Sequence, residues 1–441
     1  MALFYTSAVL DIKLIRERPD FIRERLMARG TGEEAMLNDL LRADERRRTL
    51  LAEVETLKAR RNLVSKEIGM MLSQKRTADA EERKVETREI GDKITRLDKE
   101  VAEAEAARDE ILLRLPNAPH PTVSVGTSAA DNPVVRSWGE KPEQKFKRKA
   151  HMELCESLGL VDFARGAKIS GAGFLLYTNW GARLERGLTQ MLLDLHVNEH
   201  GYTEISPPFI VNRESMVGSG QFPKFVDQAY AVQEGLDTSS AGRYFLIPTA
   251  EVPVANIHRG EILAESRLPI RYCAYSPCFR AEAGAAGVGT RGMIRVHQFD
   301  KVELIHIVRP EEGYETLEKM VLHAERVLQL LGLHYRVVLL CTGDMGFGSA
   351  KTYDIEVWSA GQGSYLEVSS CSNFEEFQAR RMNLRFKDAA GEIRFPHILN
   401  GSGTALARLF VALIETWQQP DGSILIPPPL RQYLKADRIC A

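Results

Sequence analysis

The sequence lacks the features of a disulfide-rich, metal-bound or membrane-spanning protein. It has only six cysteines in 441 residues, and no two of them are spaced as C-x-x-C. The nearest pair, Cys273 and Cys278, has no second cluster that would complete a zinc site. We therefore expect reduced, mostly buried thiols and no zinc. No apolar run approaches the roughly 18 to 20 residues that a membrane span needs.

A strong net charge is also lacking. The chain has 58 Lys and Arg residues against 60 Asp and Glu residues, so any nucleic-acid site has to rest on local basic clusters. The first ten residues are apolar but have neither the basic segment nor the cleavage site of a secretion signal. These observations predict a cytoplasmic protein that does not associate with membranes.

The common nucleotide-binding and metal motifs are missing or incomplete. The segment 343–349 contains glycines but lacks the G-K-[ST] ending of a Walker A loop, and no Rossmann fingerprint is present. The string from His196 to His200 matches the H-x-x-E-H zinc-protease pattern. It ends against Gly201 without an evident third ligand, so we expect no metal there. An ATP site in this chain must be of another kind.

The longest regular pattern is a pair of heptad repeats between Leu37 and Leu115. The short polar link 73–79 requires the two helices to fold back on each other as an antiparallel coiled-coil arm. At about 1.5 Å per residue, the arm is roughly 50 Å long. The predicted seam consists of Val54, Leu57, Arg61, Val64, Ile68 and Met71 in the first helix and Ile90, Ile94, Leu97, Val101, Ala104, Arg108, Ile111 and Leu115 in the second.

Such hairpins are more often dimerisation or spacer elements than RNA-binding elements, and the charges of this arm balance. Basic residues nevertheless cluster at 46–48, 58–61 and 75–76. Clusters of this kind favour contact with phosphates. Composition alone leaves both functions open.

The proline-rich run 116–121 ends the second helix and predicts a domain boundary. We expect an N-terminal domain over residues 1–118, a linker over 119–142 and a second domain over 143–441. The strands of the second domain are connected through hairpins and insertions, which predicts an α+β fold with an antiparallel sheet flanked by helices.

The residues with the most informative chemistry lie in a predicted hairpin from Tyr272 to Val308. Arg280 and Glu282 follow the first strand, and residues two apart on a strand share a face. Guanidinium binds phosphate in bidentate fashion, and a carboxylate accepts from an exocyclic amine. Phe299 on the second strand is suited to stacking on a base. In isolation, however, an exposed Arg–Glu pair is the commoner explanation.

Three further segments carry polar residues that suit an amino acid or phosphates. Thr249 and Glu251, taken with Glu303, supply a hydroxyl and two carboxylates for a small zwitterion, although a helix cap explains Thr249 equally well. Hard oxygen donors of the kind that Mg²⁺ takes are present at Glu367 and Ser370. Arg408 lies in the first turn of a helix, where a cation is unfavourable unless an anion answers it.

Taken together, these segments resemble the bacterial-type seryl-tRNA synthetases, which are class II aminoacyl-tRNA synthetases. The hairpin resembles motif 2, residues 183–211 resemble the dimer-forming motif 1, and residues 399–417 resemble motif 3. The resemblance runs from about Leu10 to Tyr433. One departure is Val288-Gly289, where many bacterial relatives have Arg-Asp in a loop that approaches the acceptor end of the tRNA.

The resemblance implies an activity and a set of partners. The enzyme would activate L-serine with ATP and Mg²⁺ and transfer it to tRNA(Ser), and also to tRNA(Sec). It would be a homodimer and would bind tRNA through the long variable arm and the acceptor end.

The resemblance also implies roles for individual residues. The catalytic residues would be Arg280 and Arg408, and the metal ligands Glu367 and Ser370. Serine would be bound by Thr249, Ala250, Glu251, Glu303 and Ser402. ATP would be bound by Arg280, Ala281, Glu282, Val296, Phe299, Glu367, Val368, Ser369, Ser370 and Arg408.

Two alternatives remain open from the residues. One is an enzyme that activates an amino acid but loads a carrier protein, and the other is a catalytically inactive paralogue. The long arm argues against the first, and the complete set of polar residues argues against the second.

Overall fold

The computed structural model describes residues 10–143, 146–235, 242–283 and 292–440. It divides into two compact units. The first contains the described residues up to Met27 together with Gly32–Leu115, and the second contains Ala28–Thr31 and the residues from Pro116 onward. Among the described helices, none is long and apolar enough to cross a membrane.

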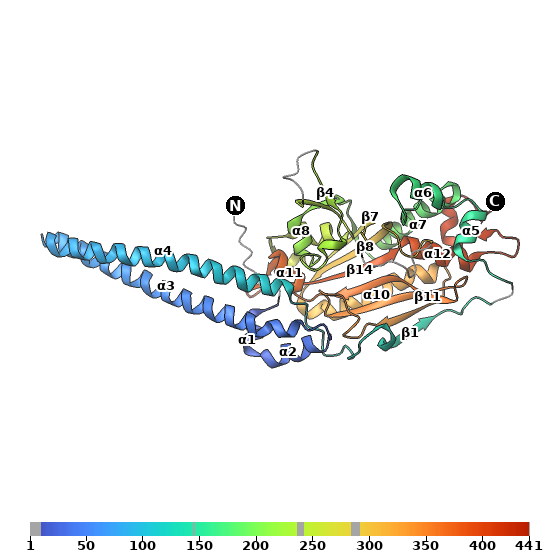
Figure 1. The fold of residues 1–441 in the computed structure, drawn as a ribbon. Helices are drawn as coiled ribbons and strands as arrows, with labels where there is room; N and C mark the ends of the chain where they lie inside the picture. The colour runs from blue at the N-terminus through green and yellow to red at the C-terminus, as the bar shows by residue number, and fades with distance from the viewer. Residues whose placement is uncertain (1–9, 144–145, 236–241, 284–291, 441) are drawn as a thin grey trace. The chain divides into compact units, whose positions relative to one another are not determined.

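The first unit contains the predicted coiled-coil arm. Two short helices, α1 (Ile12–Glu17) and α2 (Pro19–Met27), precede the long helices α3 (Met36–Ser73) and α4 (Thr77–Arg114), which run antiparallel (Figure 1). Every predicted seam position is buried or half-buried, which confirms the heptad assignment. Near the base, Leu112 is more deeply buried than the predicted Ile111, because α4 ends within one turn and the strict repeat no longer applies.

Ion pairs join the two helices along the arm. Arg47 pairs with Glu105, Lys58 with Asp98, Arg60 with Glu86, Lys93 with Glu53 and Arg83 with Glu67. Basic residues that the sequence assigns to clusters therefore also hold the hairpin together. Exposed pairs of this kind contribute only about 0.2–1 kcal/mol each to stability, so their basic side chains can readily bind other anions instead.

The second unit is built on an eight-stranded sheet. Its neighbours are antiparallel except for the edge pair β2 and β7, which is parallel. In spatial order the strands are β1 (Val134–Trp138), β9 (Tyr335–Leu339), β10 (Lys351–Ser359), β11 (Ser364–Asn373), β14 (His397–Ala405), β8 (Gln298–Val308), β7 (Ile270–Phe279) and β2 (Thr203–Glu204).

Strand β1 lies within the segment 119–142 that the sequence assigns to a linker. It pairs with β9 and places Trp138 stacked on Tyr335, with the ring centroids 5.8 Å apart. The strand is difficult to predict because proline and glycine flank it on both sides. A strand of only five residues also has little periodicity of its own.

Helices cover both faces of the sheet. One hydrophobic core contains residues of α7 (Asn179–Asn198), α10 (Gly313–Leu330) and α12 (Leu406–Trp417), and the opposite core contains residues of α9 (Glu251–Ala255) and α11 (Phe377–Met382). In α7 the buried residues recur every three or four positions, which turns one apolar stripe onto the sheet. The remaining helices are α5 (His151–Ser157), α6 (Phe163–Ser170), α8 (Arg213–Gly218) and α13 (Pro428–Leu434).

Among the described residues of this unit, three small sheets accompany the large one. They are β3 (Ile210–Asn212), β5 (Tyr244–Leu246) and β4 (Ala231–Val232); β13 (Ile393–Arg394), β12 (Arg385–Lys387) and β6 (Ile262–Ala264); and β15 (Ile424–Leu425) with β16 (Arg438–Ile439).

Strand β8 positions the polar cavity described below. Val302 and Leu304 belong to the core on one face, so the alternation of a strand turns Phe299, Lys301 and Glu303 to the other face. All three of these residues line the cavity. The fold is thus the α+β architecture predicted from sequence, with a mixed rather than purely antiparallel sheet.

Candidate active site

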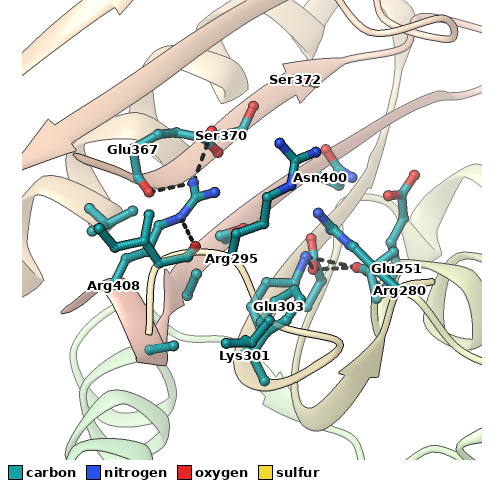
Figure 2. Close-up of a pocket in the computed structure, with 18 of the residues that line it drawn as sticks. Glu251, Arg280, Arg295, Lys301, Glu303, Glu367, Ser370, Ser372, Asn400 and Arg408 are labelled. Carbon is teal, nitrogen blue, oxygen red and sulfur yellow. Dashed lines mark hydrogen bonds and ion pairs between the residues drawn. The ribbon is translucent and has the colours of Figure 1, made fainter. Parts of the chain in front are cut away.

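A polar cavity of about 370 Å³ opens on the face of the sheet opposite α7, which is within the size range of small-molecule sites. Figure 2 shows carboxylates and cations gathered at its two ends, with Arg295 between them. The lining residues are Gln221, Thr249, Glu251, Arg280, Glu282, Ile294, Arg295, Val296, Phe299, Lys301, Glu303, Glu367, Val368, Ser370, Ser372, Phe374, Asn400, Ser402, Ala405, Ala407 and Arg408.

One end is organised by a buried network around the Thr249 hydroxyl. This hydroxyl donates to Glu303 Oε2 at 2.7 Å and accepts from Lys301 Nζ at 2.8 Å. It also accepts from the backbone N–H of Glu251 at 3.1 Å. Lys301 pairs with Glu303 as well, and the two side chains are 7% and 1% exposed. A buried ion pair gains stability from further hydrogen bonds to its members, and here the Thr249 hydroxyl bonds to both of them.

A second carboxylate, Glu251, lies beside this network at the start of α9. Its Oε1 accepts from the amide of Gln378 at 2.5 Å. Burial, reinforced by the neighbouring Glu303 carboxylate, raises the pKa of Glu251 to about 7. Two buried carboxylates beside a single lysine form a site that favours one additional cation.

The middle of the cavity combines an aromatic ring with two arginines. The guanidinium carbon of Arg280 lies 5.1 Å from the centroid of the Phe299 ring. Arg295 donates to Glu282 Oε2 at 2.5 Å. A base stacked on Phe299 would therefore lie beside both cations and one carboxylate.

The strand geometry predicted for Arg280 and Glu282 is wrong, although both residues line the cavity. Strand β7 ends at Phe279, and Glu282 has a positive φ of 49°. The strand pairing continues by one residue, since Arg280 N donates to His297 O at 2.9 Å and His297 Nδ1 lies 2.9 Å from Arg280 O. The backbone then turns at Glu282. Glu282 reaches the cavity through this turn rather than through strand alternation.

The other end of the cavity is built by β11 and the first turn of α12. Arg408 donates to the carbonyl oxygen of Glu367 at 2.9 Å and to its Oε2 at 3.2 Å, and Nε donates to Ile294 O at 3.1 Å. This explains how a cation is held at a helix start. Ser370 lies on the same strand, opposite the half-buried Asp354 of β10, whose pKa is raised by burial and by the Glu367 carboxylate.

Most of the predicted residues meet in this single cavity, and three do not line it. Ala250 is fully buried in the core beside α9 and α11. Ala281 is held by a backbone hydrogen bond to Gln228 at 3.0 Å. Ser369 faces away and donates to the carbonyl oxygen of Ser402 at 2.6 Å, as expected for the residue that alternates with Val368 and Ser370 on a strand.

Several lining residues were not predicted from sequence. Lys301 was detectable, because it lies between Phe299 and Glu303 on the same face of one strand. Arg295 precedes the start of β8, so no periodicity marks it. The others are Gln221, Ile294, Ser372, Phe374, Asn400, Ala405 and Ala407.

The departure at Val288-Gly289 lies outside the described residues.

The H-x-x-E-H string lies at the end of α7. The Nδ1 atoms of His196 and His200 are 3.0 Å apart, and His196 Nε2 lies 3.4 Å from Gly403 O. Within the described part of the chain, no group of three or more His, Cys, Asp or Glu residues is arranged to hold a metal.

Two family models match the chain. Residues 9–119 match the seryl-tRNA synthetase N-terminal domain, and residues 230–417 match the class II tRNA synthetase core domain of the G, H, P, S and T enzymes. Serine–tRNA ligase of Carboxydothermus hydrogenoformans is 52% identical over 432 residues, covering 98% of this chain and 99% of the relative. Serine–tRNA ligase of Geobacter sulfurreducens is 53% identical over 427 residues, covering 97% and 98%.

Solved structures give the same result. The crystal structure of seryl-tRNA synthetase from Pyrococcus horikoshii complexed with ATP has a TM-score of 0.90 and 40% identity, covering 98% of this chain and 99% of that chain. The cytoplasmic serine–tRNA ligase of Naegleria fowleri in complex with AMP has a TM-score of 0.86 and 29% identity, with 98% of each chain covered.

Proposed function

The chain belongs to the seryl-tRNA synthetase family and is an enzyme that ligates serine to tRNA using ATP, and from this premise we propose how its cavity performs the reaction. Serine occupies the end near Thr249, Glu251 and Glu303. ATP extends from Phe299 toward Arg408. The residue roles are inferred from the chemistry of each end.

The buried carboxylates select the amino acid. The ammonium and hydroxyl groups of serine are donors, and Glu251 and Glu303 are the acceptors that face them. Ser402 lies across from Glu303 on the neighbouring strand and closes the same end. Alanine leaves a buried acceptor unpaired, whereas threonine differs only by one methyl, which a pocket rejects by about 1–3 kcal/mol. Threonine is therefore the expected error.

The nucleotide is held by stacking and by charge. Its adenine stacks on Phe299, and Glu282 accepts from the exocyclic amine, with Val296 at the edge of the ring. Arg280 binds the α-phosphate and Arg408 the γ-phosphate. Glu367 is half-exposed in its pair with Arg408, so its carboxylate remains accessible to a second partner.

The residues at this end also fit Mg²⁺ that arrives with ATP. Glu367 and Ser370 supply two hard oxygen donors, and among the described residues no group of three or more His, Cys, Asp or Glu could form a dedicated metal cage. Mg²⁺ typically takes one or two carboxylates and completes its shell with water and phosphate oxygens. The ion would neutralise charge on the phosphates.

The reaction is an in-line displacement. A serine carboxylate oxygen attacks the α-phosphorus, the bond to the bridging oxygen breaks, and pyrophosphate leaves with that electron pair. Arg280 and Arg408 stabilise the charge that develops, and the cavity fixes the two reactants in position. A hydroxyl of the terminal ribose of tRNA then displaces AMP from seryl-adenylate.

The arm is the tRNA-binding element in this proposal. Residues 1–118 form the tRNA-binding domain, 119–142 connect it, and 143–441 form the catalytic domain. The arm holds the long variable arm of tRNA(Ser), and of tRNA(Sec), through shape and phosphate contacts. The basic side chains of its surface ion pairs leave their weakly bound acidic partners and bind phosphates of the tRNA. The enzyme works as a cytoplasmic homodimer formed through motif 1, which includes α7.

The observation that carries the proposal is a single cavity with two buried carboxylates, Glu251 and Glu303, toward one end and Arg408 toward the other. Serine-dependent exchange between ATP and labelled pyrophosphate tests it. We expect robust exchange with serine, weak exchange with threonine and none with alanine. Exchange that prefers another amino acid would contradict the assignment of Glu251 and Glu303.

A further inference from the structure

Lys301 is a buried lysine at the centre of the amino-acid end of the cavity. Its ammonium contacts the Thr249 hydroxyl and Glu303 Oε2, and its side chain is only 7% exposed. A lysine this deeply buried usually keeps a partner in one arrangement.

The hydrogen bonds leave the Thr249 hydroxyl with no free capacity. A hydroxyl has one donor and two acceptor positions. Here the donor goes to Glu303, and the acceptors receive Lys301 Nζ and the backbone N–H of Glu251. In this arrangement the Thr249 hydroxyl is used fully by protein partners. Its side chain links the lysine to both acidic residues.

The same network orients Glu303. Its Oε2 accepts from Thr249 and Lys301, whereas its Oε1 has no hydrogen-bond partner among the described residues. One oxygen is thus fixed by the protein, and the other is left as an acceptor toward the cavity. A carboxylate in this state accepts hydrogen bonds from a substrate and donates none.

We propose that Lys301 is a positioning residue for amino-acid selection, which orients Glu303 directly and through Thr249 so that the free oxygen of Glu303 accepts hydrogen bonds from the substrate. The inference rests on the proposed function of this cavity. The proposed role of Lys301 is in specificity. It differs from the phosphate-binding role of Arg280 and Arg408, which line the same cavity.

The titratable groups around this pair make the effect of losing the lysine predictable. Glu251 lies on α9, Cys278 on β7, Cys371 on β11 and Arg280 just after β7. Burial raises the pKa values of both thiols, that of Cys371 to about 12, so they stay neutral. Arg280 is exposed and its charge is screened by solvent.

Without Lys301, two buried carboxyls therefore share a space with no buried cation. The Lys301 charge lowers the pKa of Glu251 in the intact protein, so Glu251 is protonated over a wider pH range once the lysine is lost. A protonated carboxyl presents a donor where serine needs an acceptor. The ammonium and hydroxyl of serine then form weaker hydrogen bonds with the site, and the preference for serine over alanine decreases.

The test compares Lys301→Met, which keeps the length of the side chain, with Lys301→Arg, which keeps its charge. Serine-dependent pyrophosphate exchange is measured from pH 6 to pH 9, and the KM for ATP is measured at saturating serine. For Lys301→Met we expect kcat/KM for serine to fall at least 30-fold at pH 7 and to recover partly by pH 9. The KM for ATP should stay within threefold, and the preference for serine over alanine should fall at least tenfold.

Lys301→Arg should keep the pH profile of the wild type even if its rate is lower. An equal loss in the serine and ATP parameters of Lys301→Met, with an unchanged pH profile, would overturn the inference, because a merely structural lysine behaves that way. An unchanged serine preference would overturn it too.

If Lys301→Met does not fold, Thr249→Val carries the test. This shape-matched change breaks the link to Glu303, and the preference for serine over alanine must fall at least tenfold. A wild-type enzyme without serine-dependent exchange would refute the proposed function itself. Normal wild-type exchange with an unaffected variant would refute only the role of Lys301.

Discussion

Arg280 is the residue whose replacement tests the chemistry of the cavity most sharply. Its side chain is exposed, its hydrogen bond to Pro248 O is long at 3.4 Å, and its guanidinium lies over Phe299. The fold therefore depends little on it. Arg280→Ala should leave the thermal unfolding midpoint almost unchanged.

The effect on catalysis should be large by contrast. Removing one preorganised group that stabilises transition-state charge costs about 3–4 kcal/mol, or roughly 10²–10³-fold in kcat. Serine-dependent pyrophosphate exchange at saturating serine and ATP measures this loss directly. Arg280→Lys should recover only part of the rate, because an ammonium keeps the charge but lacks the planar fork.

A matched control lies on the same strand. Arg271 is also exposed, near the opposite end of β7, and it does not line the cavity. Arg271→Ala should keep the wild-type exchange rate. Near-normal exchange by Arg280→Ala, or an equal loss in both variants, would refute the placement of the α-phosphate beside Arg280.

Three further predictions concern pH, metal and tRNA. The pKa of Glu251 is raised to about 7, and its ionised form binds the serine ammonium, so kcat/KM for serine should rise roughly tenfold from pH 6 to pH 8. Glu251→Gln should lower kcat/KM for serine and flatten its pH profile. A steep pH profile in that variant would contradict the assignment of Glu251. Glu367→Gln should raise the Mg²⁺ concentration needed for half-maximal exchange severalfold with little change in the KM for serine, and an unchanged Mg²⁺ requirement would count against the metal site. The distal half of the arm is removed by joining its helices at Lys58 and Asp98, whose charged atoms are 3.4 Å apart. Pyrophosphate exchange should persist in this variant, while tRNA charging should fall at least 100-fold. Normal charging would show that this half of the arm does not bind tRNA.

The sequence was most informative where a pattern repeats. The heptads of the arm predict both long helices, since an apolar seam has to face a partner helix along its whole length. Alternation along β8 explains why Phe299 and Glu303 meet in one cavity. Local pattern and tertiary contacts agree in these elements.

Other features depend on contacts between distant segments. Nothing near Thr249 indicates that its hydroxyl is saturated, because Lys301 and Glu303 approach it from another strand. Glu282 reaches the cavity through a left-handed turn that a strand pattern does not reveal. The edge strand β1 is too short to be distinguished from the linker around it.

We infer that one chain both activates serine and transfers it to tRNA. The most direct test is attachment of radiolabelled serine to purified tRNA(Ser) by the intact enzyme, run beside serine-dependent pyrophosphate exchange. We expect both activities from the wild type, and we expect Arg280→Ala to lower both by about 10²–10³-fold. Exchange without transfer to tRNA would contradict the assigned role of the arm, and the absence of both activities would contradict the assignment of the cavity.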